Sequence, residues 1–143
     1  MGELPQQRPG DVTILDMEAS IEHLTRGTVR NVDVLLVVTE PYYRSLETTG
    51  RIVPLARDLG LANVFVVANK ARTERDAAAI REYCDRRGFP ILAEIPFDEH
   101  ISEADRLGQA LIDAQPSAPA VAAITHLAEA LMERLGVTTP ARR

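Results

Sequence analysis

Four short apolar runs, separated by stretches with helical periodicity, constrain the fold of this chain more than any other feature. The runs are "VTIL" at 12–15, "VDVLLVV" at 32–38, "VFVVA" at 64–68 and "ILAEI" at 91–95. Three of them are continuous and rich in Val and Ile, which is typical of parallel strands covered on both faces. The alternation of strands and helices predicts a three-layer α/β/α fold with a mainly parallel sheet.

The intervening stretches carry recognisable helix signals. In "YRSLETTGRIVPLARDLG" the apolar residues cluster on one face, Gly60 fits a C-terminal cap, and Pro54 is expected to kink or break the helix. The stretch "TERDAAAIREYCDRRG" begins at an expected Thr73 N-cap and stops at Gly88. After "DEHISEADRLGQALID", which suggests one or two short helices, residues 118–135 predict a last amphipathic helix. Its polar face lacks a Lys/Arg excess, which favours packing on the sheet over membrane binding.

Composition limits the class of protein. A chain of 143 residues predicts one domain over 1–143, with a frayed tail at 137–143. The net charge of -5 argues against the positive surface of a nucleic-acid binder. No apolar run approaches the roughly 18 residues of a membrane span, and the polar start does not resemble a signal peptide. We therefore expect a cytoplasmic protein without nucleic-acid or membrane partners. The one cysteine, Cys84, lies on a helical apolar stripe and is predicted to be a core thiol.

Polar residues follow all four predicted strands, at the edge where parallel sheets bind ligands. They are Asp16 and Glu18, then Thr39, Glu40 and Pro41, then Asn69 and Lys70, then Pro96, Phe97 and Asp98. A carboxylate directly after a buried strand needs a cationic partner, and in nucleotide-binding sheets that partner is the magnesium ion of a bound triphosphate. The four polar strand ends together therefore favour a site.

Each of these residues also has a purely structural interpretation. Asp16 and Asp98 fit helix or turn caps, and Asn69 fits a residue that satisfies loop backbone groups. The loop "ANKAR" resembles the base-reading loop of GTPases, in which an aspartate stands two residues after Asn-Lys. That position is Arg72 here. Without the acid nothing accepts from the guanine amino group, so Asn69 favours adenine as the base.

Longer stretches resemble a known family. They are "DMEASIEHLTRGT", "VDVLLVVTEPYYRSLET", "VFVVANK" and "IPFDEHISEAD". Over Asp11 to about Gly136 the chain resembles the later two-thirds of carbon-monoxide-dehydrogenase maturation ATPases. These nickel-insertion accessory proteins belong to the deviant-Walker ATPases, with nitrogenase iron protein and the septum-site and plasmid-partitioning ATPases.

The resemblance implies a P-loop-like fold, ATP and magnesium as cofactors, a homodimer, and a metalloenzyme client such as carbon monoxide dehydrogenase. It implies that Asp16 serves the magnesium ion through water, as a Walker B-like residue. Glu18 is a further candidate, and Ser20 stands at the switch position, where the family usually has glycine. The adenine pocket would consist of Asn69 and the loop Pro96, Phe97 and Asp98.

Two family motifs are absent from the sequence. None of the eight glycines begins a G-x-x-x-x-G-K-[ST] pattern, and the only lysine, Lys70, follows the third predicted strand. The Cys-x-Cys pair of the maturation branch is missing too, so no nickel site is expected. The sequence thus predicts the acid and base-binding parts of an ATP site without the phosphate loop or its strand. We expect no ATP hydrolysis by this chain alone, and an unpaired apolar edge at 12–15 that promotes dimers or aggregates.

Three accounts of this pattern remain open. The first is an incomplete ATPase: a truncated gene, a start at an internal Met1, or one half of a split protein that lacks its N-terminal half. The second is a non-catalytic module that binds a partner. The third is a remnant of a partitioning-type ATPase.

Overall fold

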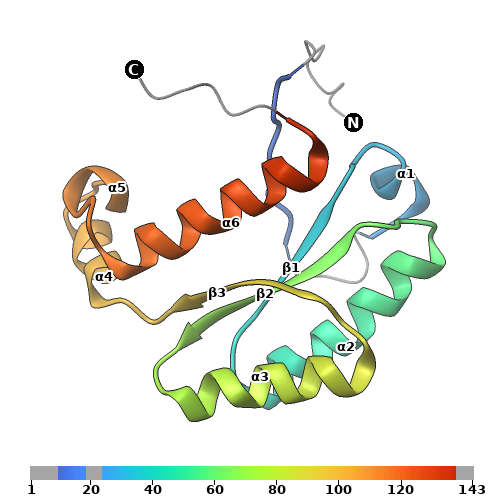
Figure 1. The fold of residues 1–143 in the computed structure, drawn as a ribbon, viewed down its shortest axis with the longest axis horizontal. Coiled ribbons are helices and arrows are strands. Elements are labelled where there is room, and N and C mark those ends of the chain that lie inside the picture. The colour runs from blue at the N-terminus through green and yellow to red at the C-terminus, as the bar shows by residue number, and fades with distance from the viewer. Residues whose placement is uncertain (1–9, 19–23, 138–143) are drawn as a thin grey trace.

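The structure, a computed structural model, describes residues 10–18 and 24–137. The described residues form a parallel sheet in the order β1-β2-β3 with helices on both faces (Figure 1). The elements are α1 (Arg26–Val29), β1 (Leu35–Thr39), α2 (Tyr43–Asp58), β2 (Val64–Ala71), α3 (Glu74–Arg87), β3 (Ile91–Pro96), α4 (Glu99–Arg106), α5 (Leu111–Ala114) and α6 (Pro119–Leu135). Helices α2 and α3 lie on one face and α6 on the other, so the predicted three-layer α/β/α fold is confirmed.

Strand β2 forms the centre of the sheet and is buried on both faces. Val64, Val66 and Ala68 belong to the core cluster between the sheet and helices α2 and α3. Phe65 and Val67 alternate with them and therefore point to the opposite face. There the guanidinium of Arg134, in α6, lies 4.7 Å from the centre of the Phe65 ring. The continuous apolar sequence of β2 follows from this two-sided burial.

The predicted strand at 12–15 is wrong. Residues 11–18 adopt no helix or strand, and Val12, Ile14 and Leu15 are 54%, 89% and 50% exposed. A strand exists only where a neighbour accepts its backbone hydrogen bonds, and no strand of the described chain pairs with this segment. β1 pairs only with β2 among the described strands, so its other edge is open within the described part of the chain.

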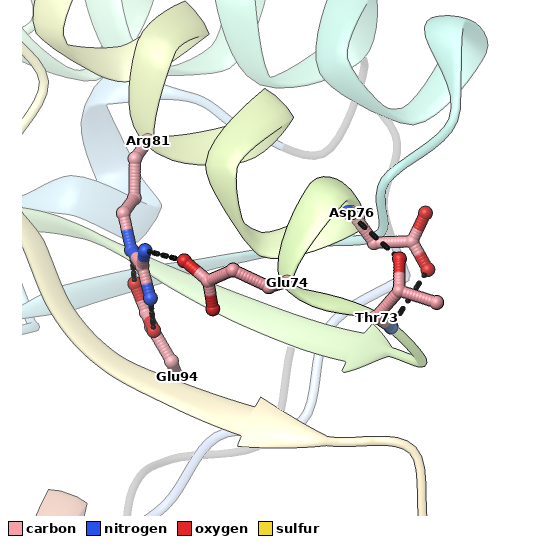
Figure 2. Close-up of polar contacts among 5 residues, drawn as sticks. All are labelled: Thr73, Glu74, Asp76, Arg81 and Glu94. Carbon is pink, nitrogen blue, oxygen red and sulfur yellow. Dashed lines mark hydrogen bonds and ion pairs between the residues drawn. The ribbon is translucent and has the colours of Figure 1, made fainter.

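Helix α3 begins and ends as its sequence predicts. The Thr73 hydroxyl accepts a hydrogen bond from the Asp76 backbone N–H (3.2 Å), and the Asp76 carboxylate accepts from that of Thr73 (3.3 Å). This is a capping box (Figure 2). At the other end Gly88 adopts a left-handed conformation with φ of 66°.

An arginine fastens α3 to the sheet. Arg81 contacts Glu94 of β3 through two N–H groups, one of them at 2.6 Å, and Glu74 of α3 at 2.6 Å (Figure 2). The hydrogen bonds from Arg81 lower the pKa of Glu94. These side chains are largely exposed, so we attribute orientation of α3 to them rather than a large share of stability.

Helix α2 runs without a break from Tyr43 to Asp58 although Pro54 lies inside it, so the break considered at this proline is absent. Gly50 in the same helix marks a close approach to α3, because a Cβ there would lie 2.2 Å from the Tyr83 hydroxyl oxygen. Next to Tyr83, the Cys84 side chain is fully buried in the core. Burial raises the pKa of this thiol to about 11, and its predicted core position is confirmed.

Candidate functional site

The carboxyl ends of β1 and β2 are joined by polar contacts. Thr39, buried at the end of β1, lies 3.1 Å from the hydroxyl of Ser45 in the first turn of α2. The same Ser45 oxygen accepts a hydrogen bond from the backbone N–H of Glu40 at 2.9 Å. The Glu40 carboxylate in turn pairs with the Lys70 ammonium at 2.7 Å. Lys70, the only lysine in the sequence, is therefore already paired with an acid in this structure.

The end of β2 contains an irregularity centred on Lys70. The pairing with β3 shifts register between Asn69 and Ala71, and Lys70 has a left-handed backbone with φ of 57°. A left-handed non-glycine residue costs about 1–2 kcal/mol, so neighbouring contacts must hold it. The Asn69 side-chain oxygen accepts from the Lys70 backbone N–H at 3.0 Å. Its amide nitrogen has no hydrogen-bond partner within the described residues and is left to donate to a ligand.

Asp98, at the end of β3, holds two helices with one buried carboxylate. One oxygen accepts from the His100 backbone N–H (3.0 Å) and lies 2.6 Å from the His100 ring nitrogen Nδ1. The other accepts from the backbone N–H of Ala120 in the first turn of α6 (3.0 Å). The hydrogen bond from Ala120 is the main cause that lowers the Asp98 pKa, with His100 adding to it against the effect of burial. The predicted cap is present, and it extends to a second helix that the sequence did not indicate.

Phe97 and Arg72 bring the ends of β2 and β3 together. The Phe97 backbone N–H donates to the Ala71 carbonyl at 3.0 Å, and the Arg72 backbone N–H donates to the Asp76 carboxylate at 3.0 Å. The Arg72 guanidinium lies over the Phe97 ring, 3.6 Å from its centre. Sequence reasoning identified Phe97 as a pocket residue and Arg72 only as a missing acid. Their contact joins residues 25 positions apart, and no local signal predicts it.

The acidic candidates are placed differently. Asp16 and Glu18 are exposed on the segment that does not form a strand, and Ser20 lies outside the described residues. No group of three or more His, Cys, Asp or Glu side chains that could hold a metal ion occurs in the described chain. A lone carboxylate fits a magnesium ion held through water better than direct multidentate coordination. The structure thus brings Asn69, Pro96, Phe97 and Asp98 to the edge of the sheet at which β2 and β3 end.

A groove of about 400 Å³ runs along the open edge of β1. Its walls come from β1, from α2 and from the segment around Met17 and Glu18. The apolar residues Leu24, Leu36 and Ile52 contribute to the lining, as does Val38, which is 57% exposed. An apolar strand edge without a cover is a surface for association.

Among the described residues no helix is long and apolar enough to cross a membrane.

The fold and the polar strand ends define a P-loop-type α/β/α domain, and known structures share that fold. The septum site-determining protein MinD of Pyrococcus horikoshii, solved with Mg-ADP, matches 73% of this chain and 43% of its own length, with 28% identity and a TM-score of 0.61. A ParA family ATPase from Chlorobium tepidum matches 78% of this chain and 46% of its own, with 26% identity and a TM-score of 0.61.

Sequence relatives narrow the assignment. No protein-family model matches the chain. The carbon monoxide dehydrogenase accessory protein CooC of Rhodospirillum rubrum is 41% identical over 128 residues, which are 90% of this chain and 47% of CooC. The ATP-binding protein MJ0823 of Methanocaldococcus jannaschii is 41% identical over 100 residues, 69% of this chain and 38% of its own. The chain belongs to the CooC-like family of deviant-Walker ATPases, and it spans less than half the length of these relatives.

Proposed function

We propose that this chain carries the base-binding part of an ATP site in a CooC-like ATPase. The observation that supports it most is the convergence of Asn69 with the loop Pro96–Asp98 at the adjacent ends of β2 and β3. The amide nitrogen of Asn69 can donate to a purine ring nitrogen. Its oxygen, which accepts from Lys70 with one lone pair, can accept with the other from the amino group of adenine, where guanine has a carbonyl. The Phe97 ring offers an apolar face. Asp98 acts in this proposal by fixing the loop, because both of its oxygens accept backbone hydrogen bonds.

The triphosphate would need groups that the chain supplies only in part. Asp16 would hold the magnesium ion through water, with Glu18 beside it and Ser20 near the terminal phosphate. A phosphate-binding loop would normally add backbone amides and a lysine, and the sequence contains no such pattern. Lys70 is engaged with Glu40. We therefore propose that the 143-residue chain by itself does not turn over ATP.

The biological role that we propose follows from the likeness to CooC. CooC is named as an accessory protein of carbon monoxide dehydrogenase. We propose that this chain contributes to ATP-dependent insertion of nickel into a metalloenzyme client, as part of a dimer in the cytoplasm. The apolar groove beside β1 favours a second candidate, a non-catalytic module that binds a partner protein there.

Nucleotide titration of the purified chain tests the first proposal. Base contacts alone are expected to give dissociation constants on the order of millimolar, equivalent to about 4 kcal/mol. ATP, ADP and AMP should bind almost equally, because without a phosphate-binding loop each additional phosphate adds little binding free energy. Asn69→Ala should weaken all three, and Asp16→Asn should leave AMP binding unchanged. Micromolar ATP affinity with strong preference over AMP, or ATP turnover that Asp16→Asn abolishes, would contradict the proposal.

A further inference from the structure

The contact between Arg72 and Phe97 is distinguished by its place, because among the arginine–ring contacts of the described residues it is the one that follows the carboxyl ends of two strands. Arg51, Arg81 and Arg86 each pair with a glutamate. The Arg72 guanidinium has no carboxylate within ion-pair distance in the described part of the chain, and its contact there is the Phe97 ring. An exposed arginine held only by a ring face is free to move away from that face.

The two residues differ in how firmly they are held. Phe97 is partly buried, and its backbone N–H is bonded to Ala71. The buried carboxylate of Asp98 fixes the next residue. The Arg72 backbone is anchored to Asp76, but its side chain is exposed. One wall of this pair is therefore rigid, and the other is a flexible, planar cation.

The guanidinium carbon lies 3.6 Å from the centre of the Phe97 ring, which is the distance of a close face contact. Opening the pair to about twice that spacing makes room for one planar base between them. A purine has two π faces, and both an aromatic ring and a guanidinium stack on such faces. Asn69 stands opposite Ile95 of β3 in the sheet, two residues before Phe97, so we assign the edge of the base to it.

We propose that Arg72 and Phe97 form a clamp that takes a purine base between the guanidinium and the ring. The inference rests on the proposed function, since it assigns the two faces of the base whose edge Asn69 contacts. Adenine and guanine present similar π faces, so stacking in the clamp adds affinity for both bases and does not discriminate between them. Discrimination between the two bases belongs to Asn69.

The test is an NMR titration of the 143-residue chain with adenosine, AMP and GMP. Arg72→Ala should raise the dissociation constants for adenosine and AMP by about fivefold or more, since stacking on a side chain commonly contributes that much per base. GMP binding should weaken by the same factor. Asn69→Ala should instead change the ratio of AMP to GMP affinity. In the wild-type chain the Phe97 ring and Arg72 side-chain signals should shift during the adenosine titration.

The chain offers a matched control. The Arg87 guanidinium lies over the Tyr83 ring at the same 3.6 Å distance. This contact is at the C-terminal end of α3, away from the carboxyl ends of β2 and β3. Arg87→Ala removes a ring contact of the same distance, one positive charge and a hydrogen bond to the Tyr83 carbonyl, and adenosine binding should not change. Both arginines are exposed, so both variants should retain the folded spectrum.

The outcomes separate the clamp from the pocket. If wild-type chain binds adenosine and Arg72→Ala binds it equally well or better, the clamp is wrong and the base pocket stands. If Arg72→Ala weakens AMP but not adenosine, Arg72 contacts phosphate, which also overturns the clamp. If the wild-type chain binds neither adenosine nor AMP, the proposed base pocket fails and the clamp fails with it.

Discussion

Removal of the Asp98 carboxylate should destabilise the contact between the sheet and two helices at once. In Asp98→Ala the backbone N–H groups of His100 and Ala120 lose their acceptor. Ala120 is fully buried, so water cannot replace the lost partner. For a chain of this length two lost caps should lower the melting temperature by about 5–10 °C. Asp98→Asn keeps one acceptor oxygen and should cause roughly half of that decrease.

The pH dependence gives the prediction a sign. The folded-state pKa of Asp98 lies below its ordinary value of 3.8, so the carboxylate stabilises the fold fully above that value. The contribution disappears as pH falls through the folded-state pKa, because the protonated acid loses its strength as an acceptor. Thermal unfolding followed by circular dichroism at neutral pH and between about pH 3 and 4 should show the wild-type and Asp98→Ala curves converging on acidification.

A control separates the backbone caps from the histidine contact. His100→Ala removes the ring nitrogen that lies 2.6 Å from Asp98 but leaves both backbone hydrogen bonds in place. It should lower the melting temperature less than Asp98→Ala does. Equal melting temperatures for wild type and Asp98→Ala at neutral pH would refute the reasoning, as would a difference that stays constant down to pH 3.

Three further predictions follow from the packing. Gly50→Ala should stabilise α2 by about 1 kcal/mol when Tyr83 is also replaced by Phe. In the wild-type background the gain should be smaller, because the Tyr83 hydroxyl oxygen lies 2.2 Å from the new Cβ and must move. Equal changes in the free energy of urea unfolding in both backgrounds would contradict this. Thr73→Ala should cost about 1 kcal/mol through loss of the capping box, and a change below 0.3 kcal/mol, roughly the limit of the measurement, would mean that the box is redundant. The chain should form dimers or aggregates in light scattering, and Val38→Lys at the open edge of β1 should shift it toward monomer, whereas a monodisperse wild-type monomer would count against edge association.

Local signals in the sequence were sufficient for most of the fold. The caps of α3 at Thr73 and Gly88 depend on residues within one helical turn, and the apolar run of β2 reflects its own burial. The prediction of a strand at 12–15 was wrong for a physical reason, because an extended apolar run becomes a strand only when another strand pairs with it. The sequence lacks the phosphate-loop pattern whose strand was expected beside this segment, so the missing partner was predictable and the strand itself was the wrong expectation.

The site was predictable in part, since the ends of parallel strands converge by topology. Asn69 was identified from its position near the end of β2, and Asp98 from its position just after β3. The contacts that determine their chemistry connect distant residues: Asp98 with Ala120, and Arg72 with Phe97. The register shift at Lys70 was equally hidden, because it depends on how β2 meets β3.

The burial of Cys84 makes the alkylation rate of its thiol a measure of how often this chain opens. Thiol reagents attack the thiolate, and a pKa of about 11 keeps that form scarce near neutral pH. The side chain is also inaccessible in the folded core. Alkylation can then proceed only from states in which α3 has separated from the sheet, so its rate counts those events. The sequence has a single cysteine, and none of the proposed substitutions changes it, so the alkylation rate of Cys84 can be compared among all variants without an added label.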